Sequence, residues 1–428
     1  MNESSDVRDR LNRLNALRSA GRAASAYPSS PTRGMPANMP PALPALMGSP
    51  QPIDALFAGD TRHNALGSSY MIPTRHTPDH VHGSRPLSAW LVQDLAGAAA
   101  FSRDPRLLRL DPRRCAFLDT ETTGLSAGAG TLVFLIGIGV FTDQGFEVRQ
   151  FFLRDPAEEP AMLHAIQTLL QDYDALVTFN GRSFDVPLLT SRYTLNRQRT
   201  RLDSLANLDL LHPARRLWKR RLESCRLSAL ETAILQVRRT NDDVPGMLIP
   251  QLYHDYLRTG DARYMQRVIY HNLIDVLSMV TLAAHLCETF AQPSASDLPC
   301  DDLISLARWY DGLGKSEQAE VTYAAALSAA RHGRDKATIL ECLAALLKRQ
   351  ERWHDAAACW QTLTELLPTS TDPRIELAKY HEWHNRDFEQ ARAWTHDAIR
   401  VANTNVVAYQ REALLADLQH RLARLDHK

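Results

Sequence analysis

Apolar positions along the chain change their spacing several times, and each spacing predicts an element. Short apolar runs predict strands at 115–121, 131–142, 145–154, 175–179 and 207–211. Apolar residues at helical spacing predict helices after Pro156, after Phe184 and over 262–290. Three consecutive strands followed by alternating helices and strands predict a mixed α/β sheet flanked by helices.

The same patterns divide the chain into four segments. Residues 1–85 are expected to hold a short helix at 4–20 and then a largely flexible, Pro- and Ser-rich stretch. The α/β domain is expected over 86–292, and a linker over 293–302. Residues 303–428 are expected to be entirely helical.

Small residues recur in the helical segment at near-regular intervals. Ala307 and Ala344 are 37 residues apart, as are Ala319 and Ala356, and Ala378 follows Ala344 by 34. This period resembles that of tetratricopeptide repeats, with tryptophans expected to fill the seams or the groove. The repeats either present a surface for a protein or peptide partner, or only cap and stabilise the α/β domain.

Composition narrows the class of protein. The 49 basic and 49 acidic residues balance, so any nucleic-acid-binding patch must be local. The six cysteines are scattered, which argues against a disulfide framework and a zinc site. No apolar run is expected to cross a membrane, and the charged N-terminus has no apolar signal core, so we expect a cytoplasmic protein without a membrane partner.

Acidic residues stand at places where a buried charge needs a partner. Asp119 and Glu121 end an apolar strand and, being two apart, point to the same side. Asp185 falls in the first turn of a predicted helix. His271 and Asp275 lie one turn apart on one face of the helix over 262–290.

Four carboxylates in one place repel one another unless cations lie between them. Oxygen ligands favour Mg²⁺ or Mn²⁺, and two such ions can hold the attacking and leaving oxygens of a phosphodiester. A histidine beside the ligands can accept the proton of the attacking water. The pattern therefore predicts a two-metal site for phosphate-ester hydrolysis.

Three motifs carry a family resemblance. In order, "LDTETTGL", "FNGRSFD" and "HNLID" resemble the motifs of the DEDD exonuclease superfamily, on a ribonuclease H-like fold, and are closest to the YprB-type ribonuclease H-like proteins. The resemblance covers roughly residues 55–290. It implies metal ligands at Asp119, Glu121, Asp185 and Asp275, and His271 as the general base. His271 lies four residues before Asp275, whereas histidine-type members have five, the position that Tyr270 holds here.

Basic residues follow the second motif. Candidates for nucleic-acid contact are Arg192, Arg197, Arg215, Arg216, Lys219 and Arg220. The alternative is a solvated basic helix face. Two functions remain: a metal-dependent nuclease of DNA or RNA, most simply a 3′–5′ exonuclease, or a non-cleaving nucleic-acid-binding or scaffold protein with a degenerate nuclease domain.

Overall fold

A mixed sheet forms the centre of the first domain. The computed structural model describes residues 48–124, 130–240, 243–291 and 298–428. Its seven-stranded sheet has the order β1-β2-β7-β6-β5-β8-β9. The strands are β1 (Asp60–Asn64), β2 (Gly67–His76), β5 (Cys115–Thr122), β6 (Val133–Thr142), β7 (Gly145–Phe152), β8 (Ala175–Thr178) and β9 (Ala206–Asp209). Pairing is antiparallel from β1 to β5, whereas β5, β8 and β9 are parallel, which confirms the predicted mixed sheet.

The expectation of a flexible segment up to residue 85 was wrong for its second part. β1 and β2 form an antiparallel pair, and β2 joins the sheet along β7. Tyr70, Met71 and Ile72 are buried there. The polar edge strand β1 and Pro73 within β2 hide the strand period in the sequence. The predicted helix at 4–20 lies outside the described residues.

Helix α9 (Met265–Ala291) crosses the sheet beside β5 and β6. Two glycines on β6 permit this close approach: a Cβ at Gly137 would collide with Asn272 of α9, and one at Gly139 with Val276. By length and composition α9 could cross a membrane, but 72% of its most apolar window is buried inside the fold. Its apolar character is therefore that of a core helix. The sequence pattern had not indicated that this helix is long and apolar enough to pass such a test.

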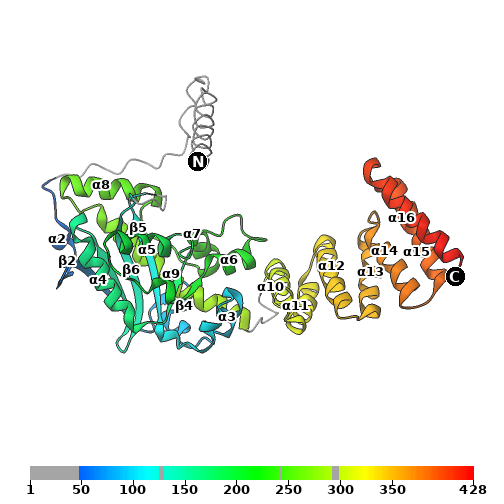
Figure 1. Cartoon of the computed structure of the whole chain (residues 1–428), viewed down its shortest axis with the longest axis horizontal. Helices are drawn as coiled ribbons and strands as arrows, with labels where there is room; N and C mark the ends of the chain where they lie inside the picture. The colour runs from blue at the N-terminus through cyan, green and yellow to red at the C-terminus, as the bar shows by residue number, and fades with distance from the viewer. Residues whose placement is uncertain (1–47, 125–129, 241–242, 292–297) are drawn as a thin grey trace, which may run out of the picture. The chain divides into compact units, whose positions relative to one another are not determined.

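The other helices of this domain pack around the sheet, and their arrangement is visible in Figure 1. Helix α4 packs against β1 and β2, and α6 packs against the second domain. The bounds are α2 (Ile53–Leu56), α3 (Ala96–Ser102), α4 (Glu159–Leu169), α5 (Asp185–Leu195), α6 (Leu211–Trp218), α7 (Leu227–Leu230) and α8 (Ile249–Thr259). A short ribbon of β3 (Val81–His82) and β4 (Arg85–Pro86) lies outside the large sheet.

The described residues from 300 onward form helices, each packed on the next. They are α10 (Cys300–Gly312), α11 (Ser316–Ala329), α12 (Gly333–Arg349), α13 (Trp353–Leu366), α14 (Asp372–Trp383), α15 (Phe388–Asn405) and α16 (Ala408–Asp426). The recurring alanines Ala307, Ala319, Ala344, Ala356 and Ala378 are all buried at helix contacts. This confirms an all-helical second region, whose first helix begins inside the expected linker.

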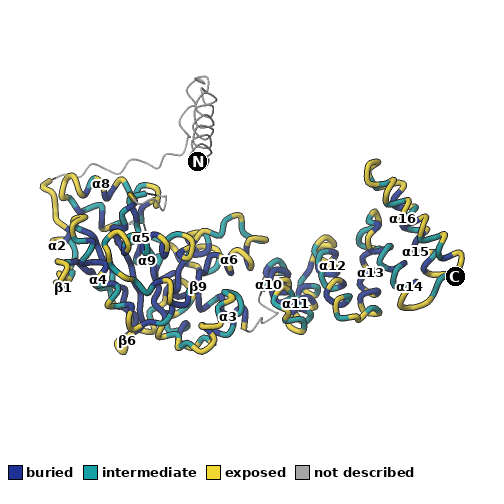
Figure 2. Tube along the Cα trace, viewed as in Figure 1, coloured by how far each residue is buried: buried dark blue, intermediate teal, exposed yellow. Residues whose placement is uncertain are grey.

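The tryptophans of the helical region behave differently from one another. Trp309 and Trp360 are buried, as expected of residues that fill seams. Trp383 is 48% exposed, with the Arg421 guanidinium over its ring, so it fills no seam. Figure 2 shows buried positions continuing from the sheet through the helices.

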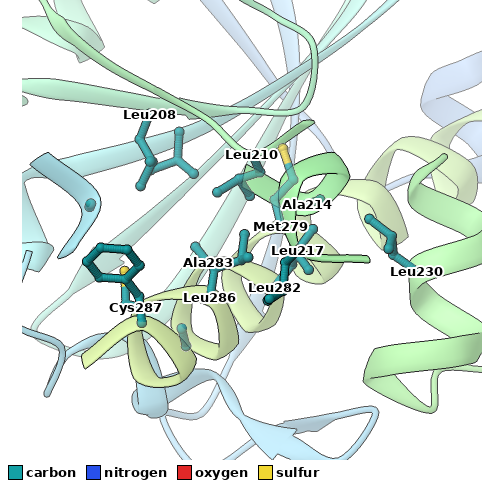
Figure 3. Close-up of a cluster of buried hydrophobic side chains, with 14 of the residues drawn as sticks. Leu208, Leu210, Ala214, Leu217, Leu230, Met279, Leu282, Ala283, Leu286 and Cys287 are labelled. Carbon is teal, nitrogen blue, oxygen red and sulfur yellow. The ribbon is translucent and has the colours of Figure 1, made fainter. Parts of the chain in front are cut away.

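One apolar core joins the two regions. The part of this core that β9, α6 and α9 form includes Leu208, Leu217, Met279 and Leu282 (Figure 3). It continues through Phe290 to Trp309 and Tyr310 of α10. The Phe290 ring centroid lies 5.1 Å from that of Trp309 and 5.0 Å from that of Tyr310. This aromatic seam, completed by Phe101 at 5.3 Å from Trp309, packs α10 against the sheet domain.

Candidate active site

Asp119 is held by a buried amide network at the end of β5. Across the β5–β6 pair it faces Gly137, whose missing side chain makes room for Asn272. The Asn272 amide donates to Asp119 Oδ2 at 2.8 Å. Gln150 donates to Asn272 Oδ1 at 2.9 Å, which turns the Asn272 NH₂ group toward the carboxylate. Strand, glycine and helix thus fix the orientation of Asp119 before any ligand binds.

Asp185 lies in the first turn of α5 and is only 6% exposed. Its Oδ1 accepts a hydrogen bond from the Thr120 hydroxyl, the residue between Asp119 and Glu121. The charge of Asp185 also acts on Asp119 and Glu121 electrostatically. The second motif is therefore brought to the end of β5, with its carboxylate bonded to Thr120.

His271 faces the acids from α9. Its Nε2 lies 4.0 Å from Glu121 Oε1 and 3.6 Å from Asp275 Oδ2. Its Nδ1 lies 2.7 Å from Asp243 Oδ1. The hydroxyl of Tyr270, the alternative base, instead accepts a hydrogen bond from the Thr240 backbone at 3.2 Å. The proton-accepting atom of His271 therefore lies beside the candidate ligands, whereas the hydroxyl of Tyr270 contacts the backbone of Thr240.

The carboxyl groups of Asp119, Glu121, Asp185 and Asp275 form an acidic cluster, and Arg239 places a positive charge beside it. Its guanidinium bonds to Asp275, and it forms two bonds of 2.7 Å to the buried Glu231. It also lies 3.4 Å from Asp243 and 3.1 Å from His271 Nδ1. Arg239 therefore neutralises part of the charge that a divalent ion would neutralise.

Burial is the largest cause that raises the pKa of Asp119, Glu121, Asp185 and Asp275. Burial, then the charges of Asp275, Glu121 and Asp185, raise the pKa of Asp119 well above its usual value. Burial is also the main reason that the pKa of Glu121 rises to about 8 and that of Asp185 to about 6. The pKa of Asp275 is raised in the same way, against the opposing charges of His271 and Arg239.

The pKa of His271 is also raised, but in a histidine a raised pKa favours the charged form. Burial lowers it, but the bond to Asp243 and the charges of Asp275 and Glu121 outweigh burial and raise the pKa to about 9. As they stand, no three Asp, Glu, His or Cys side chains among the described residues form a group that could hold a metal ion. The four carboxyl groups are desolvated, and Arg239 and His271 are the cations beside them.

Sequence reasoning missed Asn272, Arg239, Glu231 and Asp243. Asp243 lies in the stretch "NDDVPG", outside the three motifs. A buried histidine facing carboxylates needs a partner on its other nitrogen, and this requirement is the signal that could have pointed to a nearby acid.

The basic candidates separate into engaged and available side chains. Arg192 bonds to Glu159 at 2.6 Å, Arg216 lies over the Trp309 ring, and Arg220 bonds to Asp301 at 2.5 Å. Arg192 is half-buried in its ion pair, whereas Arg216 and Arg220 are exposed although engaged, so nucleic-acid contact by these three stays a prediction. Arg197, Arg215 and Lys219 are exposed.

Comparison with known proteins defines the class first. A family model described as the RNase_H superfamily matches residues 116–287, from β5 to near the end of α9. The first domain is therefore a ribonuclease H-like domain.

A relative from Bacillus subtilis (strain 168), named "Uncharacterized protein YprB", is 32% identical over 319 residues, which cover 73% of this chain and 74% of that protein. The chain belongs to the YprB family. Among solved structures, a family B DNA polymerase from the hyperthermophilic archaeon Pyrobaculum calidifontis matches at 16% identity with a TM-score of 0.35. That match covers 49% of this chain and 29% of the polymerase chain.

Proposed function

We propose that this protein is a metal-dependent nuclease of the DEDD type that hydrolyses phosphodiester bonds of DNA or RNA, as a 3′–5′ exonuclease. One observation carries the proposal: α5 and α9 bring the carboxylates of Asp185 and Asp275 to the buried end of β5, where their charges help to raise the pKa of Asp119 and Glu121. Such a cluster is costly unless cations bind it. The cost is understandable if binding cations is its purpose.

The donor set fits Mg²⁺ or Mn²⁺. Asp119, Glu121, Asp185 and Asp275 offer only carboxylate oxygens, which these ions prefer. These residues would hold two ions, which when bound supply charge neutralisation and an acidified water. The bonds from Arg239 to Asp275 and from Thr120 to Asp185 each engage one carboxylate oxygen, and an ion would bind in competition with the positive charge of Arg239.

The histidine and its partner have separate tasks in this proposal. Asp243 holds Nδ1 of His271, which leaves Nε2 free to face Glu121 and Asp275. Cations bound to the carboxylates would offset the negative charges that raise the pKa of His271 to about 9, and the neutral ring would then accept a proton at Nε2 from the attacking water. Asp243 orients the ring and stabilises the imidazolium that forms.

A second function is favoured by the Arg239 contact. A guanidinium bonded to Asp275 can replace the metal permanently, and the domain would then bind nucleic acid without cutting it. In either case the helical region, with its tetratricopeptide-like alanine spacing, would offer a protein or peptide partner the cavity of about 360 Å³ beside Tyr380 and Trp394.

End-labelled single- and double-stranded DNA and RNA, incubated with Mg²⁺ or Mn²⁺, test the proposal. We expect stepwise shortening of a 5′-labelled strand, which stops in EDTA and in Asp119→Ala. Shortening that persists in Asp119→Ala would point to a contaminating nuclease. Binding without any product from the native chain would support the non-cleaving alternative.

A further inference from the structure

A cavity of about 720 Å³ lies beyond the ends of β8 and β9. Its walls come from Phe179 and Asn180 after β8, from α6, and from residues 223–227 before α7. β5 and β8 are parallel, with Phe117 level with Val177, so Phe179 continues at the level of Asp119. The cavity therefore opens at the sheet edge that carries the acidic cluster.

Asp209 builds the walls of this cavity. It ends β9 and is 6% exposed. Its carboxylate accepts backbone hydrogen bonds from Asn180 at 2.8 Å, Arg182 at 3.1 Å and Leu211 at 3.0 Å. Asn180 adopts a left-handed φ of 68°, a conformation that asparagine tolerates well. One buried carboxylate thus joins the loops after β8 and β9, so this part of the cavity wall is in place without a ligand.

The lining carries unpaired positive charge. Arg215, Lys219 and Arg226 line the cavity together with one acid, Glu223. Within the part of the chain that the structure describes, none of these three cations forms an ion pair, whereas the neighbouring Arg216 and Arg220 are engaged with the helical region. Arg216 and Arg220 therefore contact the helical region, whereas Arg215 and Lys219 are left for a ligand.

Apolar side chains also line the cavity. Phe179 is only partly buried, and Leu211 and Leu227 stand beside it along the cavity. An aromatic ring beside basic side chains is the combination that binds single-stranded nucleic acid, because bases stack on the ring while cations contact phosphates. The volume lies in the range of roughly 300–1,000 Å³ typical of single-ligand pockets, which suits a nucleotide and excludes a duplex.

We propose that this cavity binds one strand of nucleic acid next to the acidic cluster, with phosphates on Arg215 and Lys219 and a base against Phe179. The inference rests on the proposed nuclease function and deepens it, because it assigns a single-stranded substrate. A duplex would have to open before its end reached the cavity.

Binding without divalent ions tests the inference separately from cleavage. Fluorescein-labelled oligonucleotides of 12 residues, as single strands and as blunt duplexes, are titrated with the full chain in EDTA and followed by anisotropy over a range of salt concentrations. The test variant is Arg215→Gln/Lys219→Gln. The matched control is Arg109→Gln/Arg113→Gln, which removes the same charge from exposed positions before β5, at the opposite end of that strand.

We expect the native chain and the control to bind the single strand more tightly than the duplex. The test variant should bind the single strand about tenfold or more weakly, as for the loss of charged hydrogen bonds. Its plot of log affinity against log salt should flatten by about 1.4, because each lost phosphate contact on a single strand contributes about 0.7. An unchanged melting temperature would show that the fold is intact.

Equal binding by the native chain and the test variant, equal loss in the control, or preference for the duplex would each overturn the inference. Failure of the inference and failure of the function remain distinguishable. If the native chain binds the single strand, the test variant binds it more weakly and the native chain cleaves nothing in Mn²⁺, the nuclease function is refuted and the cavity remains a binding site. Cleavage by the native chain with unaltered binding by the test variant would refute the cavity assignment alone.

Discussion

The substitution Glu121→Gln measures how much a buried carboxylate of the acidic cluster lowers the free energy of unfolding. The side chain of Glu121 is 14% exposed at the end of β5. Burial raises its pKa most, His271 and Arg239 oppose the rise, Asp275 and Asp185 add to it, and the pKa reaches about 8. Glutamine keeps the shape of the side chain and removes the charge.

The magnitude follows from the difference between the folded and unfolded pKa values. An unfolded glutamate releases its proton near its ordinary value of 4.5, whereas the folded one holds it until about pH 8. A raised folded pKa means that the folded state binds more protons in this window, so stability falls as pH rises from 4.5 to 8. At pH 7 this costs about 3 kcal/mol, at 1.36 kcal/mol per pKa unit. Glu121→Gln should recover up to about that amount in metal-free protein.

Urea unfolding of the full chain in EDTA, at pH 5 and pH 7.5, measures the effect. We expect Glu121→Gln to raise the unfolding midpoint at pH 7.5 and to change it little at pH 5. Glu147→Gln is the matched control of opposite sign: burial raises the pKa of Glu147, but Arg149 and Arg75 lower it overall, so this substitution should destabilise. When Mn²⁺ replaces the EDTA, the gain in stability should be larger for the native chain than for the Glu121→Gln variant. A variant that is no more stable than the native chain at pH 7.5 would refute the assignment of a strained cluster.

Three further outcomes are expected. Asp243→Asn removes the carboxylate from Nδ1 of His271 and should lower single-turnover cleavage about 10- to 100-fold with unchanged oligonucleotide affinity, and an unchanged rate would exclude this role. Arg239→Gln removes the cation bonded to Asp275 and should tighten Mn²⁺ binding about tenfold by calorimetry, whereas weaker binding by a folded variant would show that Arg239 supports the site. Burial raises the pKa of Glu382, but Arg424, Lys428 and Arg421 lower it to about 2, so its contribution is present above pH 4.5 and lost as pH falls toward 2. Glu382→Gln should therefore expose α16 to hydrogen exchange at neutral pH, at a cost of about 2–3 kcal/mol, and unchanged protection would contradict this.

The sequence predicted the elements whose burial is regular. The strand that carries Asp119 begins with a continuous buried apolar run, and the helix that carries Asp275 has a long helical period. β1 and β2 escaped prediction because β1 is a largely exposed edge strand and β2 contains Pro73, so neither shows clean alternation.

The candidate site was predictable only where short motifs carry it. The acids at 119, 121, 185 and 275 stand in recognisable stretches, although their service as ligands stays a prediction. Arg239 and Asn272 reach the cluster through contacts set by the close approach of α9 to Gly137, and no local pattern encodes that approach. The same holds for Arg192, whose pairing with Glu159 depends on how α4 and α5 meet.

The aromatic seam of Phe101, Phe290, Trp309 and Tyr310 bears on how the polypeptide can be divided. Cutting the chain after residue 291 would remove two rings from this seam and expose Phe101 and Phe290 to water, which favours aggregation. A shortened version made only of the ribonuclease H-like part should thus be poorly soluble, and the helices should be produced and purified together with it.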